Sequence, residues 1–248
     1  VTKSVSDGGL GFEFKWNMGW MNDTLKYAEM DPLFRKDHHD LITFSLVYAF
    51  NENFILPFSH DEVVHMKGSM INKMPGNYDD KFSALKLLMM FMFGHPGKKL
   101  NFMGNEIAQF DEWNEWSSLT WSVLDYDSHR KYQKFFKELN EVYRKEKALW
   151  EVDDSYDGFE WIEVNNRDES VFIFERIAKD GEKIICAFNF TGVKRENYPI
   201  GVNEEGNYKV IFNSAMEKYG GHLSRNKSIK TNKEGFQGRE NSFRIDLE

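Results

Sequence analysis

The sequence contains one cysteine, Cys186, and little positive charge. A lone cysteine excludes an internal disulfide and suits a reducing compartment, so we expect a cytoplasmic protein in which this thiol is buried and inert. Lys and Arg number 32 against 40 Asp and Glu, a formal net charge of −8. This balance argues against nucleic acid as a partner, because phosphates are bound by basic side chains.

Long apolar runs and two familiar catalytic patterns are also missing. The longest strongly apolar run, 84–93, is interrupted by Lys86 and is well short of the roughly 20 residues that a membrane helix needs, so no membrane partner is expected. The sequence has no glycine-rich cradle with basic groups, so phosphate chemistry is not expected. The pattern Gly-x-Ser-x-Gly does not occur either, so nothing indicates a serine nucleophile.

What is present predicts an α/β region followed by an all-β region. The chain is 41% hydrophobic and 16% aromatic, which is enough for one large core or two modest ones. Short apolar runs alternate with helical periodicity over residues 1–152, which is typical of repeated βα units. Residues 153–248 change to short alternating strands separated by turn signals such as Asp180-Gly181, which predicts a small antiparallel β-sandwich domain.

The expected strands and helices of the first region can be placed approximately. The predicted strands are Phe12–Asn17, Phe54–Ser59 and Lys99–Met103. The predicted helices run from Gly19 to Pro32, from Leu41 to Phe50, from Asn77 to Gly94 and from Ser128 to Leu149. The second helix is hydrophobic nearly all round, so it is expected to be buried.

Each predicted strand ends in polar or ionisable side chains. The ends are Trp16-Asn17, His60-Asp61 and Asn105-Glu106. If the strands are parallel neighbours, these residues share one rim, which is where βα enzymes carry their chemistry. Carboxylates, a histidine and nearby tryptophans suit a sugar, because carboxylates stabilise an oxocarbenium-like centre and aromatic faces stack on pyranose rings.

A zinc site is the main competing interpretation of this cluster. It would be built on His60, Asp61, Glu62 and His65. The two histidines are five positions apart, whereas the helical metalloprotease signature places them four apart on one face. We therefore favour the carbohydrate interpretation and expect neither a metal nor another cofactor.

Several segments together resemble one family. They are 8–12, 15–21, 52–65, 96–109 and 156–161, and the most specific is Ser59-His60-Asp61-Glu62-Val63-Val64-His65. These segments closely resemble the bacterial 1,4-alpha-glucan (glycogen) branching enzymes of the alpha-amylase superfamily. The similarity is continuous from about Gly8 to Gly221.

The resemblance implies a retaining transglycosylation, in which an α-1,4-glucan such as glycogen is cleaved and its chain is transferred to a 6-hydroxyl. It implies that Asp61 is the carboxylate that stabilises the transition state and that His60 binds the same sugar. Further substrate-binding positions are implied for a larger group: Glu62, His65, Glu106, Trp113, Trp16 and Trp20. The family fold is a full (β/α)8 barrel with a β-sandwich after it, so residues 1–152 are expected to be its last βα units.

The resemblance also implies that part of the catalytic machinery lies elsewhere. A retaining mechanism needs a nucleophilic carboxylate and a separate acid/base carboxyl roughly 5 to 5.5 Å apart. In the family both stand on strands that come before this sequence, so we expect the chain alone to be inactive and to need the missing N-terminal part. An open barrel edge is also expected to favour self-association.

One position departs from the family pattern. Met66 stands where a glycine usually follows the second histidine, and a methionine is expected to crowd the loop because it lacks glycine's access to positive φ. The alternatives to a branching enzyme are another alpha-amylase-superfamily enzyme, such as a hydrolase or a trehalose-forming relative, and a glucan-binding or structural piece without catalysis. The run Asp61-Glu62-Val63-Val64-His65 favours branching.

Overall fold

The computed structural model describes residues 1–248, and its first half is built on a three-stranded parallel sheet. The strands lie in the order β1-β2-β3, and both neighbouring pairs are parallel. They are β1 (Lys15–Trp16), β2 (Phe54–Phe58) and β3 (Lys98–Asn101). The α-helices are α1 (Met18–Glu29), α2 (Asp40–Thr43), α3 (Ser45–Tyr48), α4 (Tyr78–Gly94) and α5 (Asp127–Lys145). This βα alternation confirms the predicted order of elements.

Two asparagines start α1 and α4, the helices that follow β1 and β2. The Asn17 side chain accepts a hydrogen bond from the backbone N–H of Trp20 at the first turn of α1. Asn77 caps α4 in a capping box, accepting from the N–H groups of Asp79 and Asp80 while the Asp80 carboxylate accepts from the Asn77 N–H. These bonds satisfy amides that have no partner within the helix. The caps therefore fix where each helix begins relative to the strand before it.

Some predicted elements differ from the observed ones. The first strand is paired only at Lys15 and Trp16, and the arm before them is bonded to the body through Val1 and Thr2 at Glu52. The helix predicted from Leu41 to Phe50 is two short helices, α2 and α3, and its complete burial was wrong, since Phe44 is 57% and Val47 66% exposed. The last helix ends at Lys145 and is followed by a separate turn of 3-10 helix up to Leu149.

Short 3-10 helices occupy many of the connections. They are η1 (Val5–Asp7), η2 (Pro32–His38), η3 (His60–Glu62), η4 (Asn105–Ile107), η5 (Trp121–Asp125), η6 (Lys147–Leu149), η7 (Tyr156–Gly158) and η8 (Glu217–Tyr219). Two of them, η3 and η4, directly follow β2 and β3. The loops at these strand ends therefore begin with tight turns.

The second half of the chain is all β. Its strands are β4 (Phe159–Glu163), β5 (Val171–Ile177), β6 (Lys183–Asn189), β7 (Arg195–Val202), β8 (Asn207–Lys209), β9 (Ser228–Lys230) and β10 (Asn241–Leu247). They form antiparallel sheets β4-β5-β6, β10-β7 and β8-β9. Ile173 of one sheet and Ile200 and Phe243 of another share a small apolar core, so two sheets pack face to face.

The two halves share the main core. Phe174 and Phe188 of the β region belong to the same cluster of buried side chains as Phe91 of α4. Arg176, which is fully buried, donates to the carbonyl oxygen of Gly94 and forms an ion pair with Asp153 at 2.6 Å. A division into separate units at residue 152 stays a prediction, and the packing joins both sides of it.

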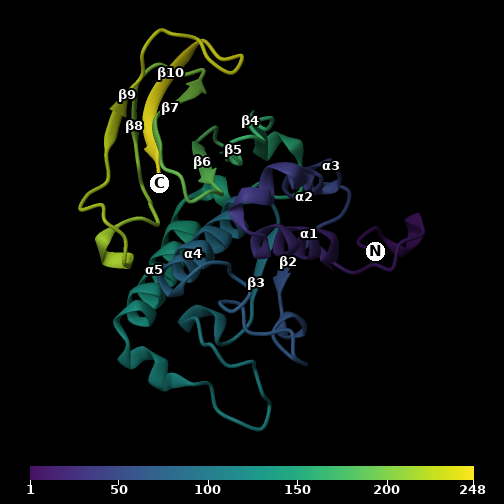
Figure 1. Ribbon diagram of the computed structural model, residues 1–248. Coiled ribbons are helices and arrows are strands. Elements are labelled where there is room, and N and C mark those ends of the chain that lie inside the picture. The colour runs from purple at the N-terminus through teal and green to yellow at the C-terminus, as the bar shows by residue number, and fades with distance from the viewer.

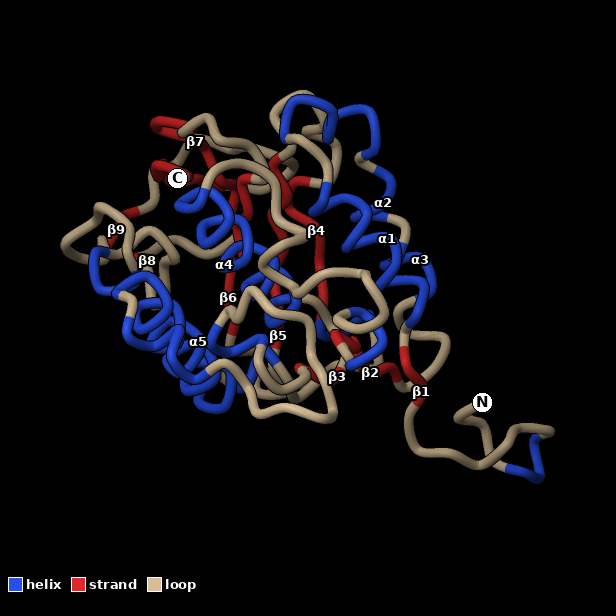
Figure 2. The backbone as a smooth tube through the Cα atoms, turned by 60° about the horizontal axis from the view of Figure 1, so that its bottom comes forward, coloured by secondary structure: helices blue, strands red, loops and turns tan.

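The overall arrangement places the strand ends away from the last β strands. In Figure 1, α4 and α5 lie side by side, β7 to β10 lie at the upper left, and the loops that follow β2 and β3 lie at the bottom. The N-terminal arm projects from the body in Figure 2. None of the helices is both long and apolar enough to cross a membrane.

Candidate functional site

The carboxyl ends of the three parallel strands meet at one edge of the sheet. β1 leads to Asn17, β2 leads to His60 and Asp61, and β3 leads to Asn105 and Glu106. Since β2 pairs with both neighbours in parallel, these ends lie on the same side of the sheet. Loops at that edge of a parallel sheet are where α/β enzymes bind ligands.

The turn after β2 presents His60 and Asp61 to solvent. Ser59 and Glu62 form a capping box, in which the Glu62 carboxylate accepts from the Ser59 N–H at 2.6 Å and from its hydroxyl at 2.8 Å. The His60 ring nitrogen Nε2 lies 3.2 Å from the Asp61 carboxylate, and these two side chains are 50% and 53% exposed. The capping box thus holds two adjacent polar side chains outward at the end of a buried strand.

Glu62 itself is not open to solvent. Its side chain is 5% exposed and its carboxylate is occupied by Ser59. Glu62 therefore lies beneath the turn and stabilises it. The substrate contact that the resemblance implies for Glu62 stays a prediction, and the side chain offers little exposed surface for it.

Aromatic side chains connect the loop after β2 to the loop after β3. The Phe102 ring lies 5.8 Å from the His60 ring and 5.2 Å from the Trp113 ring, measured between centroids. The backbone N–H of Trp113 donates to the carbonyl oxygen of Val63 at 3.0 Å. Trp113 is thereby brought beside the turn that carries Asp61, although 52 positions separate them in the sequence (113−61).

A polar cavity of about 340 Å3 opens in the loop after β3. Its lining includes Gln109, Asp111, Glu112, Trp113 and Asn114. The mixture of one indole with carboxylates and amides suits a hydroxylated ligand, which offers an apolar ring face and polar edges.

Glu106 faces inward from the same rim. Its carboxylate accepts from the Gly104 N–H at 2.7 Å, within its own turn, and the side chain is half-buried. Burial, and secondly the negative charge of Glu106, raise the pKa of Tyr132 on α5 well above its usual value. Glu106 therefore lies near the buried face of α5.

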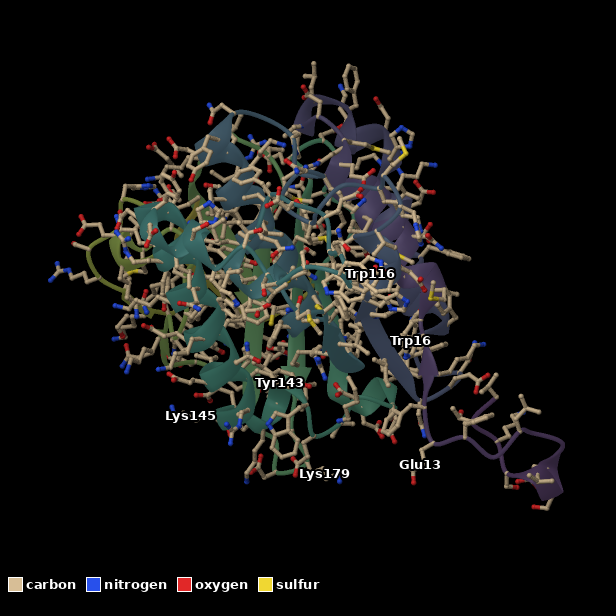
Figure 3. All side chains as sticks on the ribbon, turned by 90° about the horizontal axis from the view of Figure 1, so that it is seen from below. Glu13, Trp16, Trp116, Tyr143, Lys145 and Lys179 are labelled. Carbon is tan, nitrogen blue, oxygen red and sulfur yellow. The ribbon has the colours of Figure 1, made fainter.

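The predicted tryptophans separate into exposed and buried ones. Trp16 is 38% exposed at the end of β1, and Figure 3 views the molecule from below with Trp16 and the 88% exposed Trp116 labelled. Trp20 is fully buried, with its ring 5.2 Å from Phe58 and 5.8 Å from His95. The prediction that Trp20 binds substrate was wrong: the side chain is a core residue that joins α1 to β2.

The loop from His65 to Gly68 has an unusual backbone. His65 and Met66 have φ values of 56° and 68°, and Gly68 has 77°. Met66 is 95% exposed, so the expected crowding by its side chain was wrong, because the left-handed backbone turns it into solvent. The Glu112 carboxylate accepts from the N–H groups of Met66 and Gly68. Glu112 is the site residue that the sequence did not reveal, since no local pattern links it to a loop 44 positions earlier.

The residues considered for zinc do not gather around a common point. No three His, Cys, Asp or Glu side chains lie close enough together to hold a metal ion. Glu62 bonds to Ser59 and is buried, while His65 is exposed.

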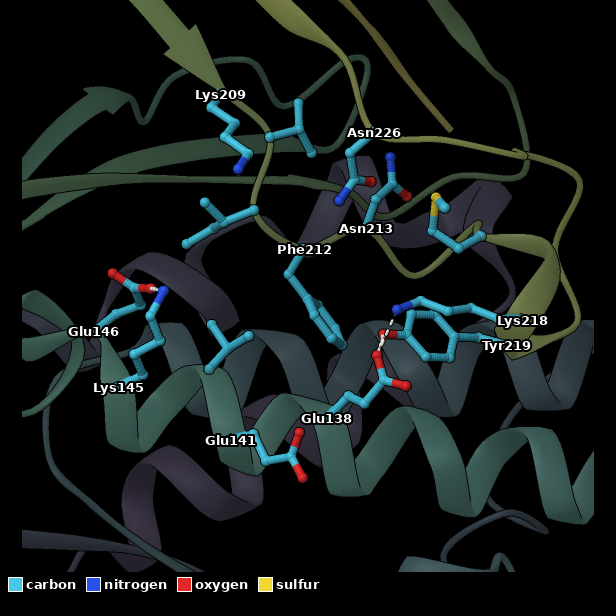
Figure 4. A pocket seen from close by; sticks show the side chains of 14 residues that line it. Glu138, Glu141, Lys145, Glu146, Lys209, Phe212, Asn213, Lys218, Tyr219 and Asn226 are labelled. Carbon is cyan, nitrogen blue, oxygen red and sulfur yellow. Dashed lines mark hydrogen bonds and ion pairs between the residues drawn. The ribbon is translucent and has the colours of Figure 1, made fainter.

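A second cavity, of about 390 Å3, lies far from this rim along the chain, between α5 and the segment 209–226 (Figure 4). There Glu138 accepts hydrogen bonds from Lys218 and from the Tyr219 hydroxyl, both at 2.5 Å. No strand-end residue lines this cavity. It is therefore separate from the candidate site.

The fold and the β region match known proteins. Residues 161–248 match the family described as alpha amylase, C-terminal all-beta domain. The pullulanase type I from Bacillus subtilis str. 168 has a TM-score of 0.62 over 87% of this chain and 33% of that chain, at 11% identity. The alpha-amylase from Geobacillus thermoleovorans has a TM-score of 0.58 over 98% of this chain and 48% of that chain, at 13% identity. These solved structures share the fold of the chain, and the β region matches a family of alpha-amylase C-terminal domains.

Sequence comparison finds relatives of much higher identity. The 1,4-alpha-glucan branching enzyme GlgB of Halothermothrix orenii is 54% identical over 92% of this chain, and that of Fusobacterium nucleatum is 52% identical over all of it. Over most of its length the chain is therefore similar to 1,4-alpha-glucan branching enzymes. It spans 36% and 41% of the lengths of these two relatives.

Proposed function

We propose that residues 1–248 form the part of a branching enzyme that binds the cleaved sugar and stabilises its transition state. In the complete reaction an α-1,4-glucan is cleaved, its chain is held covalently, and the chain is transferred to a 6-hydroxyl to form an α-1,6 branch. One observation carries the proposal: the exposed His60–Asp61 pair at the carboxyl end of β2. It occurs in a sequence more than 50% identical to proteins named for this activity.

Asp61 and His60 act on the same sugar in this proposal. The Asp61 carboxylate orients ring hydroxyls and lowers the energy of the positive charge that develops at the anomeric carbon. His60, beside it at 3.2 Å, binds a neighbouring hydroxyl. Trp113 and Trp16 offer ring faces further along the glucan, and His65 and Glu106 lie near its path.

The remaining two carboxyl groups of the mechanism come from outside residues 1–248. The carboxylates of Glu62, Glu106 and Glu112 each accept bonds from backbone amides of the rim loops. In this proposal these three carboxylates hold the rim loops, and none of them attacks or protonates the sugar. We expect the 248-residue polypeptide by itself to form no branches on amylose, and steady growth of α-1,6 linkages in such an assay would contradict this.

Glucan binding by the chain is the direct test of its own contribution. In native gels containing glycogen, the wild-type chain should be retarded, and Asp61→Ala should lose affinity by roughly tenfold or more, the effect of a lost hydrogen bond to a charged group. Asp154→Ala, an exposed carboxylate outside the rim, is the matched control and should migrate as wild type. Equal retardation of all three proteins would refute the role of Asp61.

We take the parallel sheet to be the last βα units of a (β/α)8 barrel. Joined to the rest of such an enzyme, the chain should support formation of α-1,6 linkages, whereas release of reducing sugar alone would favour the hydrolase alternative. A cytoplasmic location stays a prediction from the sequence.

A further inference from the structure

Glu112 is tied to two amides of the loop that follows the His60–Asp61 turn. Its Oε2 accepts from the Met66 N–H at 3.1 Å, and its Oε1 accepts from the Gly68 N–H at 2.5 Å. Both carboxylate oxygens are thus used by one neighbouring loop. The side chain is half-buried in the wall of the 340 Å3 cavity, next to Trp113.

The backbone of this loop has a left-handed conformation that a nearby anion stabilises. His65, Met66 and Gly68 all lie in the left-handed region, with φ of 56°, 68° and 77°. Left-handed backbone is disfavoured for residues with a Cβ atom and persists where the surroundings impose it. Successive N–H groups in such a conformation point into a shared concavity that attracts negative charge. The Glu112 carboxylate occupies this position.

Lys67, which lies between the two amide donors, connects the loop to Asp61. Its ammonium group donates to the Asp61 carbonyl oxygen at 2.7 Å. The Lys67 carbonyl oxygen in turn accepts from Lys73 Nζ at 2.7 Å. A shift of the Met66–Gly68 backbone therefore moves Lys67. Because the Lys67 ammonium group is bonded to the Asp61 carbonyl oxygen, the backbone of Asp61 moves with it.

We propose that Glu112 is a positioning residue for glucan binding: it fixes the left-handed loop at Met66–Gly68 and thereby the placement of Asp61. It acts through backbone amides and does not touch the sugar. The part of this inference that concerns glucan rests on the proposed function, whereas the part that concerns the loop does not.

The loop is tested without any ligand. In the 248-residue chain, Glu112→Ala should speed hydrogen exchange at the amides of Met66 and Gly68 by about tenfold or more, since each loses its acceptor. Exchange in α4 and β5 should stay as in wild type. Glu115→Gln, an exposed carboxylate on the same loop, is the control and should change neither amide. Unchanged exchange at Met66 and Gly68 in Glu112→Ala would overturn the proposal.

A rescue experiment separates positioning from a general structural role. Glu112→Ala should weaken maltoheptaose binding by about three- to thirtyfold, and the Cε1–H resonance of His60 should shift in its NMR spectrum. Adding Met66→Gly should recover part of the lost affinity, because glycine adopts the left-handed conformation without an anion. Affinity equal to wild type in Glu112→Ala, or no recovery in the double variant, would overturn the positioning role. If wild type itself binds no maltoheptaose, the proposed function fails, and the exchange result alone decides the role of Glu112 in the loop.

Discussion

Individual residues at the rim are placed by contacts that their neighbours make. His60 and Asp61 point to solvent because Ser59 and Glu62 use their polar groups on each other. Met66 is solvent-exposed because its backbone is left-handed. The exposure of the reactive pair is therefore a property of the whole turn.

At this scale we expect Met66→Gly to stabilise the chain. A left-handed residue with a Cβ costs about 1–2 kcal/mol, while glycine loses about 0.5–1 kcal/mol more backbone entropy on folding, so the net gain should be about 0.5–1 kcal/mol. No packing is lost, since the side chain is 95% exposed. Urea unfolding measures the change. Val193→Gly, at an exposed residue that is not left-handed, is the control and should lose stability; a loss of stability in Met66→Gly would contradict the account.

His95 is a fully buried histidine, and we expect it to make the stability of the chain depend on pH. Burial lowers the pKa of His95 to about 3 from its ordinary 6.5, and its ring bonds Ser45 and the Pro96 carbonyl oxygen. Between these two values the unfolded chain binds a proton that the native chain refuses, so the free energy of unfolding falls as pH falls from about 6.5 toward 3. This one group contributes a slope of about 1.4 kcal/mol per pH unit.

Urea unfolding from pH 4 to 7 tests this titration. His95→Gln keeps polar partners for Ser45 and Pro96 but cannot take up the proton, so its curve of stability against pH should be flatter than that of wild type. His38→Gln, at an exposed histidine, should keep the wild-type slope. Parallel curves for wild type and His95→Gln would show that another group carries the acid sensitivity.

The sequence revealed part of the candidate site and not the rest. The positions of His60, Asp61 and Glu106 at the rim were predictable because each comes within five residues of the end of a parallel strand. Glu112 was not, since its partners are backbone amides in a left-handed loop, and amide geometry has no local sequence signal. Trp20 was misjudged because burial depends on how α1 packs on β2, which residue type alone does not determine.

At the scale of elements, caps decide where helices start and so where the rim loops end. α4 begins at a capping box of Asn77 and Asp80, directly after the loop that follows the His60–Asp61 turn. Its position was predictable from the sequence because Asn and Asp stood at the expected places. The division of the predicted 41–50 helix into α2 and α3 was not, since no glycine or proline marks it.

We expect Asn77→Ala to lower stability by about 1 kcal/mol, because two helix amides lose their acceptor. Thermal unfolding followed by circular dichroism measures this loss. Asn51→Ala, at an exposed asparagine in a turn, is the matched control and should stay close to wild type. A melting temperature unchanged by Asn77→Ala would mean that α4 is positioned by packing alone.

On the scale of the whole molecule, one core joins the βα part to the β part, while the parallel sheet stays open at both sides. β1 and β3 each pair only with β2. Large apolar side chains are exposed in the N-terminal arm and on η2 and α2–α3; they include Leu10, Phe12, Leu33, Phe34 and Val47. Open strand edges and exposed apolar surface are both templates for association.

We therefore propose that the 248-residue chain associates with itself through the open edges of the sheet and this exposed apolar surface. Sedimentation velocity at rising protein concentration should show a growing fraction of dimer or larger species. Leu33→Glu together with Phe34→Glu should reduce it, and the same number of charges added at exposed Ile211 and Phe236 of the β region is the control. A single monomeric species over a wide concentration range would contradict this proposal.

In the proposed function, the loops after β2 and β3 form a glucan-binding rim. Hydrogen exchange of the 248-residue chain with and without maltoheptaose tests it most directly, because it maps protection along the chain without a mutation. We predict that maltoheptaose slows exchange in 59–68 and 102–116 and leaves 209–226, one wall of the 390 Å3 cavity, unchanged. Protection confined to 209–226, or no protection at the strand ends, would contradict the account.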